Sequence, residues 1–253
     1  MSGHSKWANI KRKKAKVDAA KGQTFSRLTK EIMSAARQGG GNPDANFRLR
    51  LAVERARAAN LPQGNIERAI QRAVGAGDGV HYEEIVYEGY GPGGTAVLLE
   101  ILTDNRNRTA GEIRHLFTRH GGNLGENGSV QWMFDPKGRI TVPKGGGWDE
   151  DRLLEAVLDA GADDLRSDDE DVFEILTPPD ELDAIQRALT DAGVPIEAVE
   201  LTRLPKTTVD VGGTEADRLM KLLDLLDDHD DVQRVYANAE FPDGEDAGSS
   251  AGF

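Results

Sequence analysis

The chain has 253 residues, a formal net charge of −13 at pH 7 and no cysteine. This length predicts two or three domains, and without cysteine the chain has no disulfide, thiol nucleophile or Cys-ligated zinc. Its longest apolar run, TAVLLEIL at 95–102, is too short for a membrane span. No apolar stretch follows the charged start, so we expect no secretion signal and a cytoplasmic location.

The net charge conceals a strong asymmetry along the chain. Residues 1–75 contain 16 Lys and Arg against 5 Asp and Glu, a balance of +11, whereas residues 76–253 contain 15 against 39, a balance of −24. Within the basic part, SGHSKWANIKRKKAK at 2–16 has six Lys or Arg and no acid. Two interpretations remain open: the basic part pairs with the chain's own carboxylates, or it binds an external polyanion.

The first 75 residues are predicted to be helical throughout. We expect a first helix with Trp7 on its apolar face, a second ended by the glycines at 39–41, a third capped by Asn42 and a fourth opened by Pro62. The third helix has two pairs of arginines at seven-residue spacing, which would form two ridges: Arg48 with Arg55, and Arg50 with Arg57.

After residue 79 strands and helices alternate, which predicts small α+β units. The strands are expected at 83–90, 95–102, 129–134, 139–143, 164–167, 171–177, 196–203, 207–211 and 232–237. The helices are expected from Asn107 to about 120, and at 150–160, 180–192 and 214–227. GPGG at 91–94 and DPKG at 135–138 are expected turns. The fold class is therefore α+β and multidomain, with an all-α N-terminal domain.

No catalytic residue, cofactor or metal site is predicted. The five histidines are scattered, and GYGPGG at 89–94 precedes a strand, which favours a hairpin over a phosphate loop. The acidic runs at 167–174 and 227–231 lack the pattern of a calcium loop. Two alternatives from other classes are a metal-dependent hydrolase built on residues 168–171 and a scaffold whose basic part docks on its own acidic domains.

A nucleic acid is the partner that the basic part fits best, because cations that displace counterions from phosphates gain affinity. About six such contacts would give a slope of log affinity against log salt of roughly −5. Trp7 and His4 could stack on a base, although the register of Trp7 with Ile10 and Val17 favours burial. The predicted nucleic-acid-binding residues are His4, Lys6, Trp7, Lys11, Arg12, Lys13, Lys14, Lys16, Lys21, Arg27, Arg48, Arg50, Arg55 and Arg57.

Several long motifs resemble the YebC family: GHSKWANIKRKKAKVDAAKGQTFSRLTKEI, GGGNPDANFRLRLAVERARAANLPQGNIERAI, YEGYGPGGTAVLLEILTDNRNRTAGEIRHLFTRHGGNLGENGSVQWMFDPKG and LPKTTVDV. The resemblance runs from Ser2 to about Ala237. It implies a helical domain at 1–78, a central α/β domain at 79–134 plus 206–239, and an acidic ferredoxin-like domain inserted at 135–205. A disordered tail is expected at 240–253.

The family resemblance implies regulation of gene expression without enzymatic activity. Members are described as probable transcriptional regulators that bind DNA, and a mitochondrial relative is a translational activator, which leaves a ribosome-associated role in relieving stalling as the alternative. The expected partners are DNA, ribosomal RNA or tRNA, or the whole ribosome. No membrane partner is expected, and the expected oligomeric state is a monomer. Because no helix presents side chains arranged for base edges, weak sequence preference or recognition of folded RNA fits these residues better than tight operator binding.

Two further segments within the recognised motif are candidate contacts. Arg106 and Arg108 lie in TDNRNRT, where a helix cap with surface ion pairs is an equal interpretation of the pattern. Asn123 and Asn127 lie in a Gly/Asn-rich loop at 121–130, which is either a binding loop or a tight return of the chain.

Overall fold

The computed structural model describes residues 22–75 and 81–241. The predicted first helix with Trp7 and the predicted tail from residue 242 onward lie outside the described residues. Residues 239 and 240, at the border of that tail, form a short strand instead, β10 (Ala239–Glu240), which pairs in parallel with β8 (Val209–Asp210).

Three helices form the described N-terminal part: α2 (Gly22–Gly39), α3 (Phe47–Ala58) and α4 (Gln63–Val74). The helical N-terminal domain is thereby confirmed over these residues. The apolar faces of the three helices meet in one core, in which Ile32, Leu49 and Ile66 are fully buried. We call these helices the helical module.

The start of α3 differs from the prediction. Its N-cap is Asn46 rather than Asn42: the Asn46 side chain accepts a hydrogen bond from Leu49 N at 3.1 Å. The same amide donates to the carbonyl oxygens of Ala35 at 2.9 Å and Gly40 at 2.8 Å. Because Asn46 is buried between two helices, it both starts α3 and satisfies carbonyls at the end of α2.

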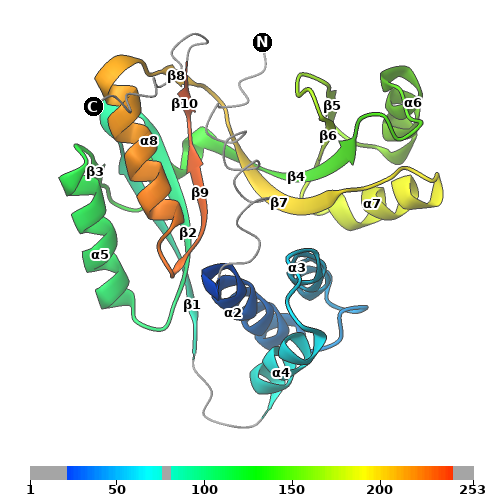
Figure 1. Ribbon diagram of the computed structural model, residues 1–253, viewed down its shortest axis with the longest axis horizontal. Coiled ribbons are helices and arrows are strands. Elements are labelled where there is room, and N and C mark those ends of the chain that lie inside the picture. The colour runs from blue at the N-terminus through cyan, green and yellow to red at the C-terminus, as the bar shows by residue number, and fades with distance from the viewer. Residues whose placement is uncertain (1–21, 76–80, 242–253) are drawn as a thin grey trace, which may run out of the picture.

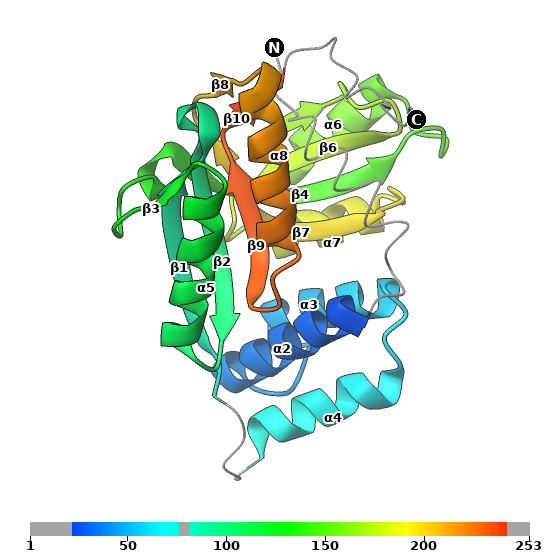
Figure 2. The same ribbon diagram turned by 60° about the vertical axis from the view of Figure 1, so that its left-hand side comes forward.

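An antiparallel sheet of order β3-β1-β2-β9 follows the helical module. Its strands are β1 (Glu83–Tyr90), β2 (Ala96–Thr103), β3 (Asn123–Leu124) and β9 (Val232–Ala237). A short 3-10 turn at Pro92–Gly94 joins β1 to β2, which confirms the predicted hairpin. Helices α5 (Arg106–Arg119) and α8 (Gly213–Asp227) lie side by side on one face of this sheet, as Figure 2 shows.

The second sheet has the order β5-β6-β4-β7 and is also antiparallel. It is formed by β4 (Phe134–Pro143), β5 (Asp164–Arg166), β6 (Val172–Thr177) and β7 (Ala198–Pro205), together with helices α6 (Glu150–Ala160) and α7 (Leu182–Asp191). The chain leaves the first sheet after β3, builds the second, and returns to the first with β9. This arrangement agrees with the expected α+β class.

The junction between the two sheets corrects two predictions. The expected strand at 129–134 is wrong, because Gln131–Met133 is a 3-10 turn and β4 begins at Phe134. The expected turn at 135–138 is also wrong, because these residues lie inside β4 and pair with β7. Gly138 permits close approach rather than a turn: a Cβ there would lie 2.2 Å from Thr177 Oγ1 on the neighbouring strand.

The helical module lies at the lower edge of both sheets in Figure 1, with α3 against β7. Leu51 of α3 is buried in the same apolar cluster as Ile140 and Ile175 of the second sheet. The module and the second sheet therefore share a core. Among the described helices, none combines the length and the apolar character needed to cross a membrane.

Candidate nucleic-acid interface

Nine of the predicted nucleic-acid-binding residues, from His4 to Lys21, lie outside the described residues. Their role therefore stays a prediction from the sequence. The five that the structure describes are the arginines of α2 and α3.

Two of these five arginines have no carboxylate partner among the described contacts. Arg27 of α2 is half-buried, and its guanidinium donates to the carbonyl oxygens of Asp227 and His229, the latter at 3.0 Å. It thereby joins α2 to the end of α8. Arg57 is exposed, and its Nε lies 3.4 Å from Gln63 Oε1, so its charge faces solvent.

The other three arginines form ion pairs with the chain's own acids: Arg48 with Glu84, Arg50 with Asp183, and Arg55 with Glu31. The predicted ridges are therefore not rows of unpaired cations. Glu84 belongs to β1 and Asp183 to α7, so two of these pairs join the helical module to the two sheets. For these residues the structure favours the self-pairing interpretation of the charge asymmetry.

The packing of α3 limits how it can meet a nucleic acid. Leu49 and Ala52 face the other helices, whereas Leu51, only 6% exposed, faces the second sheet. A recognition helix presents several side chains to base edges. In α3 three of the four arginines are held in ion pairs, so among the described residues Arg57 is the arginine of this helix that has no carboxylate partner.

The most strongly bonded acidic group at the module's edge is Asp231, in the turn between α8 and β9. Its side chain is only 3% exposed. The carboxylate accepts from Lys30 Nζ at 2.8 Å and from Arg108 Nη2 at 2.7 Å. It also accepts from Thr109 Oγ1 at 2.8 Å and from Thr103 Oγ1 at 3.3 Å. Three separate elements, α2, α5 and the end of β2, therefore converge on one carboxylate.

These contacts determine the ionisation of Asp231. Burial alone would raise its pKa, but hydrogen bonds from Lys30, Arg108 and Thr109 hold the pKa well below the ordinary value. Asp231 is therefore ionised at neutral pH, and its negative charge lies between Lys30 and Arg108. Arg108, predicted as a contact to RNA or to a partner protein, has this structural bond as well as an ion pair with Asp104.

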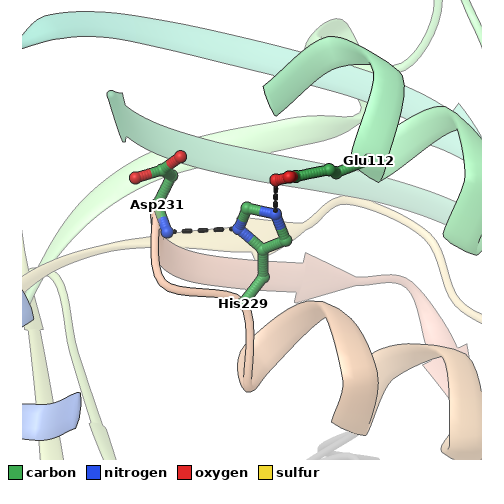
Figure 3. A group of neighbouring side chains, drawn as sticks. All are labelled: Glu112, His229 and Asp231. Atoms are coloured by element: carbon green, nitrogen blue, oxygen red, sulfur yellow. Dashed lines mark hydrogen bonds and ion pairs between the residues drawn. The ribbon is translucent and has the colours of Figure 1, made fainter. Parts of the chain in front are cut away.

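Asp231 also belongs to the one group of side chains in the described part of the chain whose ligand atoms could surround a metal ion, with Glu112 and His229. Figure 3 shows that the Asp231 carboxylate is turned away from the imidazole. His229 Nδ1 accepts from the Asp231 backbone N at 3.1 Å, and His229 Nε2 lies 2.9 Å from Glu112. Both ring nitrogens and the carboxylate are already engaged, so the group fits a structural clamp better than a metal centre. The residues at 168–171 form no such group.

A second charged cluster joins the module to both sheets. Glu31 of α2 accepts from Arg55 at 2.8 Å and from Arg234 of β9 at 3.2 Å. Burial alone would raise the pKa of Glu31, but the charges of Arg55 and Arg234 lower it below the ordinary value. Arg234 also forms an ion pair with Glu100 of β2, and Glu100 accepts a hydrogen bond from Arg203 of β7 at 3.0 Å. The junction of the three structural units is thus a chain of alternating charges.

The loop at 121–130 has an anchor that the sequence analysis missed. Glu88 of β1, only 2% exposed, accepts hydrogen bonds from the backbone N of Gly128 at 2.6 Å and of Val130 and Gln131 at 2.7 Å. Burial alone would raise its pKa, but these three donors bring the pKa below its ordinary value. The signal that could have found it is an acidic residue in a strand position that alternation assigns to a buried face.

The two asparagines of this loop are both exposed. Asn123 lies in β3 and is opposite Tyr90 of β1 in the strand register. Asn127 lies in the turn whose backbone is bonded by Glu88. The loop is therefore a tightly bonded return of the chain that still presents exposed side chains. A contact made by Asn123 or Asn127 stays a prediction.

Comparison with known proteins places the chain in a family. Residues 5–76 match the model of the TACO1/YebC protein N-terminal domain, and residues 82–239 match the model of the TACO1/YebC second and third domain. The chain belongs to the TACO1/YebC family, as the sequence resemblance indicated.

Similar proteins are known from several bacteria. A protein of Carboxydothermus hydrogenoformans, named "Probable transcriptional regulatory protein", is 57% identical over 96% of this chain and 100% of its own length. One of Persephonella marina with the same name is 56% identical over 95% of this chain and 96% of its own length. A crystal structure of a conserved hypothetical protein from Aquifex aeolicus is 48% identical, with a TM-score of 0.82, and covers 91% of this chain and 94% of that one.

Proposed function

We propose that this protein is a nucleic-acid-binding regulator of gene expression, whose basic N-terminal residues bind a phosphate backbone. The relatives' name supports regulation of transcription. The observation on which the proposal rests is the charge balance: +11 over residues 1–75 in a chain whose net charge is −13. Counterion release gives such a segment salt-sensitive affinity for DNA or RNA.

The described ion pairs support an external partner for the first 21 residues. Four carboxylates at the helical module are bonded to cations of the described residues: Glu31 to Arg55, Glu84 to Arg48, Asp183 to Arg50, and Asp231 to Lys30. These four acids therefore each have a cation partner within the described residues, which favours an external polyanion as the partner of the basic N-terminal residues.

Folded RNA, as on the ribosome, is a second candidate target. The specific observation in its favour concerns α3, because three of its four arginines are held in ion pairs and few of its side chains are left to read bases in a major groove. Backbone binding with recognition of shape suits a structured RNA. The same basic residues would bind either target, DNA or RNA, through the same electrostatic attraction to phosphate.

The test compares the wild type with a quadruple variant in which Lys11, Arg12, Lys13 and Lys14 are changed to Ala. Binding to duplex DNA and to a ribosomal RNA fragment is measured by fluorescence anisotropy, and association with ribosomes by sucrose-gradient sedimentation. A control variant changes four cations of the second sheet and its helices to Ala, namely Lys137, Arg152, Arg166 and Arg187.

We expect the quadruple variant to lose at least a hundredfold in affinity at low salt, because about four phosphate contacts are removed, and the control to lose little. A preference for a promoter fragment over competitor DNA would support transcription, and salt-sensitive sedimentation with ribosomes would support translation. Equal affinity of the wild type and the quadruple variant for both probes would contradict the proposal.

A further inference from the structure

Helix α5 is basic in a part of the chain that is otherwise acidic. It contains four arginines and one glutamate within Arg106–Arg119, whereas residues 76–253 as a whole have a balance of −24. It lies on the outside of the first sheet, next to α8 (Figure 2). Its apolar side is fully used, since Ile113 and Phe117 are buried against the sheet. The polar side faces solvent.

Two acids of this region are bonded to partners other than the remaining arginines. Asp104 pairs with Arg108 at 3.0 Å, and Glu112 lies 2.9 Å from His229. Arg106, Arg114 and Arg119 are exposed and have no carboxylate partner within the described ranges 22–75 and 81–241. Within the described residues, these three cations therefore form no ion pair with a carboxylate.

Gly111 occupies the middle of the exposed side of α5. A Cβ added there would meet no atom within 4 Å, so no internal packing requires glycine at this position. Glycine is among the poorest helix formers, and an exposed helix interior normally favours another residue. Helical spacing puts Asn107 one turn before Gly111, and Arg114 with His115 one turn after it. The bare backbone is therefore surrounded by side chains that can donate hydrogen bonds or hold positive charge.

A cluster of cationic groups continues from this side at the end of the helix. His120, at the C-cap of α5, is half-buried, and burial lowers its pKa. The nearby charges of Arg119 and of Lys221 on α8 lower that pKa further. Arg119 of α5 and Lys221 of α8 therefore both lie near His120.

We infer that the exposed side of α5, centred on Gly111 with Asn107, Arg114 and His115 around it and with Arg106 and Arg119 at the two ends of the helix, is a second phosphate-binding surface for the backbone of a nucleic acid. This inference rests on the proposed function and extends it from the basic N-terminal residues to the central domain. Guanidinium groups bind phosphate oxygens in a bidentate manner, and a glycine without a side chain lets the phosphate approach the helix closely. Contacts of this kind position a nucleic acid without reading its sequence.

The first test removes the three unpaired arginines together, as R106A/R114A/R119A. Affinity for duplex DNA and for a folded ribosomal RNA fragment is measured between about 50 and 200 mM salt. We expect at least a tenfold loss at the lower salt and a slope of log affinity against log salt that is less steep by about 2 to 3. The control R152A/R166A/R187A removes the same charge from the second sheet and its helices and should change affinity less than threefold.

The second test isolates charge from shape at the centre of the surface. Gly111→Gln and Gly111→Glu add side chains of nearly the same size into open space, so both variants should keep the fold, as circular dichroism will verify. We expect Gly111→Glu to bind at least tenfold more weakly than Gly111→Gln, because only the glutamate repels phosphate. The probe with the larger ratio, DNA or RNA, identifies the source of the phosphate.

The outcomes separate this inference from the proposed function. If K11A/R12A/K13A/K14A loses affinity while all α5 variants bind like the wild type, the α5 surface is overturned and the function stands. Equal weakening by Gly111→Gln and Gly111→Glu, together with unchanged binding by R106A/R114A/R119A, would also overturn a phosphate site, because only the space at Gly111 would then matter. If the wild type binds neither probe, both the proposed function and this inference are wrong.

Discussion

At the scale of single residues, Asp231 shows how one buried acid can join distant parts of the chain. Lys30 is 201 residues away in sequence and Arg108 is 123 residues away, yet both donate to the same carboxylate. A buried charge is costly unless it is paired and fully hydrogen-bonded, and here it has two cationic and two hydroxyl donors. Removing that charge takes from Lys30 and Arg108 the buried carboxylate that they share, and leaves Arg108 with the exposed Asp104.

We expect Asp231→Asn to lower the free energy of unfolding by about 3 kcal/mol or more, because it breaks a buried ion pair from one side. Asp104→Asn is a matched control, since Asp104 bonds the same Arg108 but is 45% exposed. It should cost less than about 1 kcal/mol. Urea denaturation followed by circular dichroism measures both, and equal losses would contradict the role given to burial.

Glu200 of β7 predicts a dependence of stability on acid. Burial alone would raise its pKa, but the charge of Arg139 and the ion pair between them lower the pKa from 4.5 to about 2. Because the folded-state pKa lies below the unfolded value, this stabilisation is fully present above about pH 4.5 and is lost as the pH falls toward 2. Its size is at most about 3 kcal/mol.

Glu200→Gln is the variant that checks this dependence. The difference in unfolding free energy between the wild type and Glu200→Gln should be constant from neutral pH down to about 4.5 and should shrink below it. Urea midpoints at a series of pH values provide the measurement. A difference that stays unchanged down to pH 3 would show that the ionised form of Glu200 contributes nothing.

At the scale of elements, local periodicity predicts most helices and strands, whereas their junctions depend on distant side chains. The helix at 150–160 is found with the same bounds, and the strand at 232–237 likewise. The strand expected at 129–134 fails because Glu88, some 40 residues earlier, binds the amides of Val130 and Gln131 and forces a turn. No pattern within 129–134 could have revealed this.

The same limit applies to the candidate site. Composition reveals the basic N-terminal residues, but it cannot tell which arginines are left for a partner. Arg50 is paired only because the fold brings Asp183 of α7 beside α3, at a separation of 133 residues. Gly111 was not singled out, since only the structure shows that the space around it is open.

The loop anchored by Glu88 supplies a prediction at this scale. Glu88→Gln replaces one acceptor oxygen with a donor that opposes the backbone N–H groups. We expect faster hydrogen exchange at Gly128, Val130 and Gln131 and a loss of about 2 kcal/mol in stability, since bonds to a charged acceptor are removed. Glu126→Gln, on the exposed surface of the same loop, is the control. Similar exchange rates in the two variants would contradict the anchoring role.

At the scale of the whole molecule, ion pairs and one shared core hold the helical module against two sheets. Arg50 and Arg187 both bond Asp183, but Arg50 crosses from α3 whereas Arg187 lies on α7 itself. We expect Arg50→Ala to accelerate hydrogen exchange at the start of α7 and in α3, with a cost of about 1 to 2 kcal/mol. Arg187→Ala should leave α3 unchanged. If both variants affect α3 equally, the pair does not join the two units.

The cations of the basic N-terminal region and of α5 fall into two groups. Cations on α2 and α3 pair with carboxylates of the sheets, which orients the helical module. We propose that the cations of residues 1–21, together with Arg106, Arg114 and Arg119 of α5, bind a polyanion. The acidic surfaces of the other parts of the protein would repel that polyanion and so restrict its contact to the basic surfaces.

The salt dependence of nucleic-acid affinity tests this division most directly. For the wild type, log affinity for duplex DNA or ribosomal RNA should fall with log salt at a slope of roughly −5 if six N-terminal cations contribute, and more steeply if α5 adds its own contacts. The variant with Lys11, Arg12, Lys13 and Lys14 changed to Ala should lose about 3 to 4 from the magnitude of that slope. A wild-type affinity that does not change with salt, or an unchanged slope in the variant, would contradict the account.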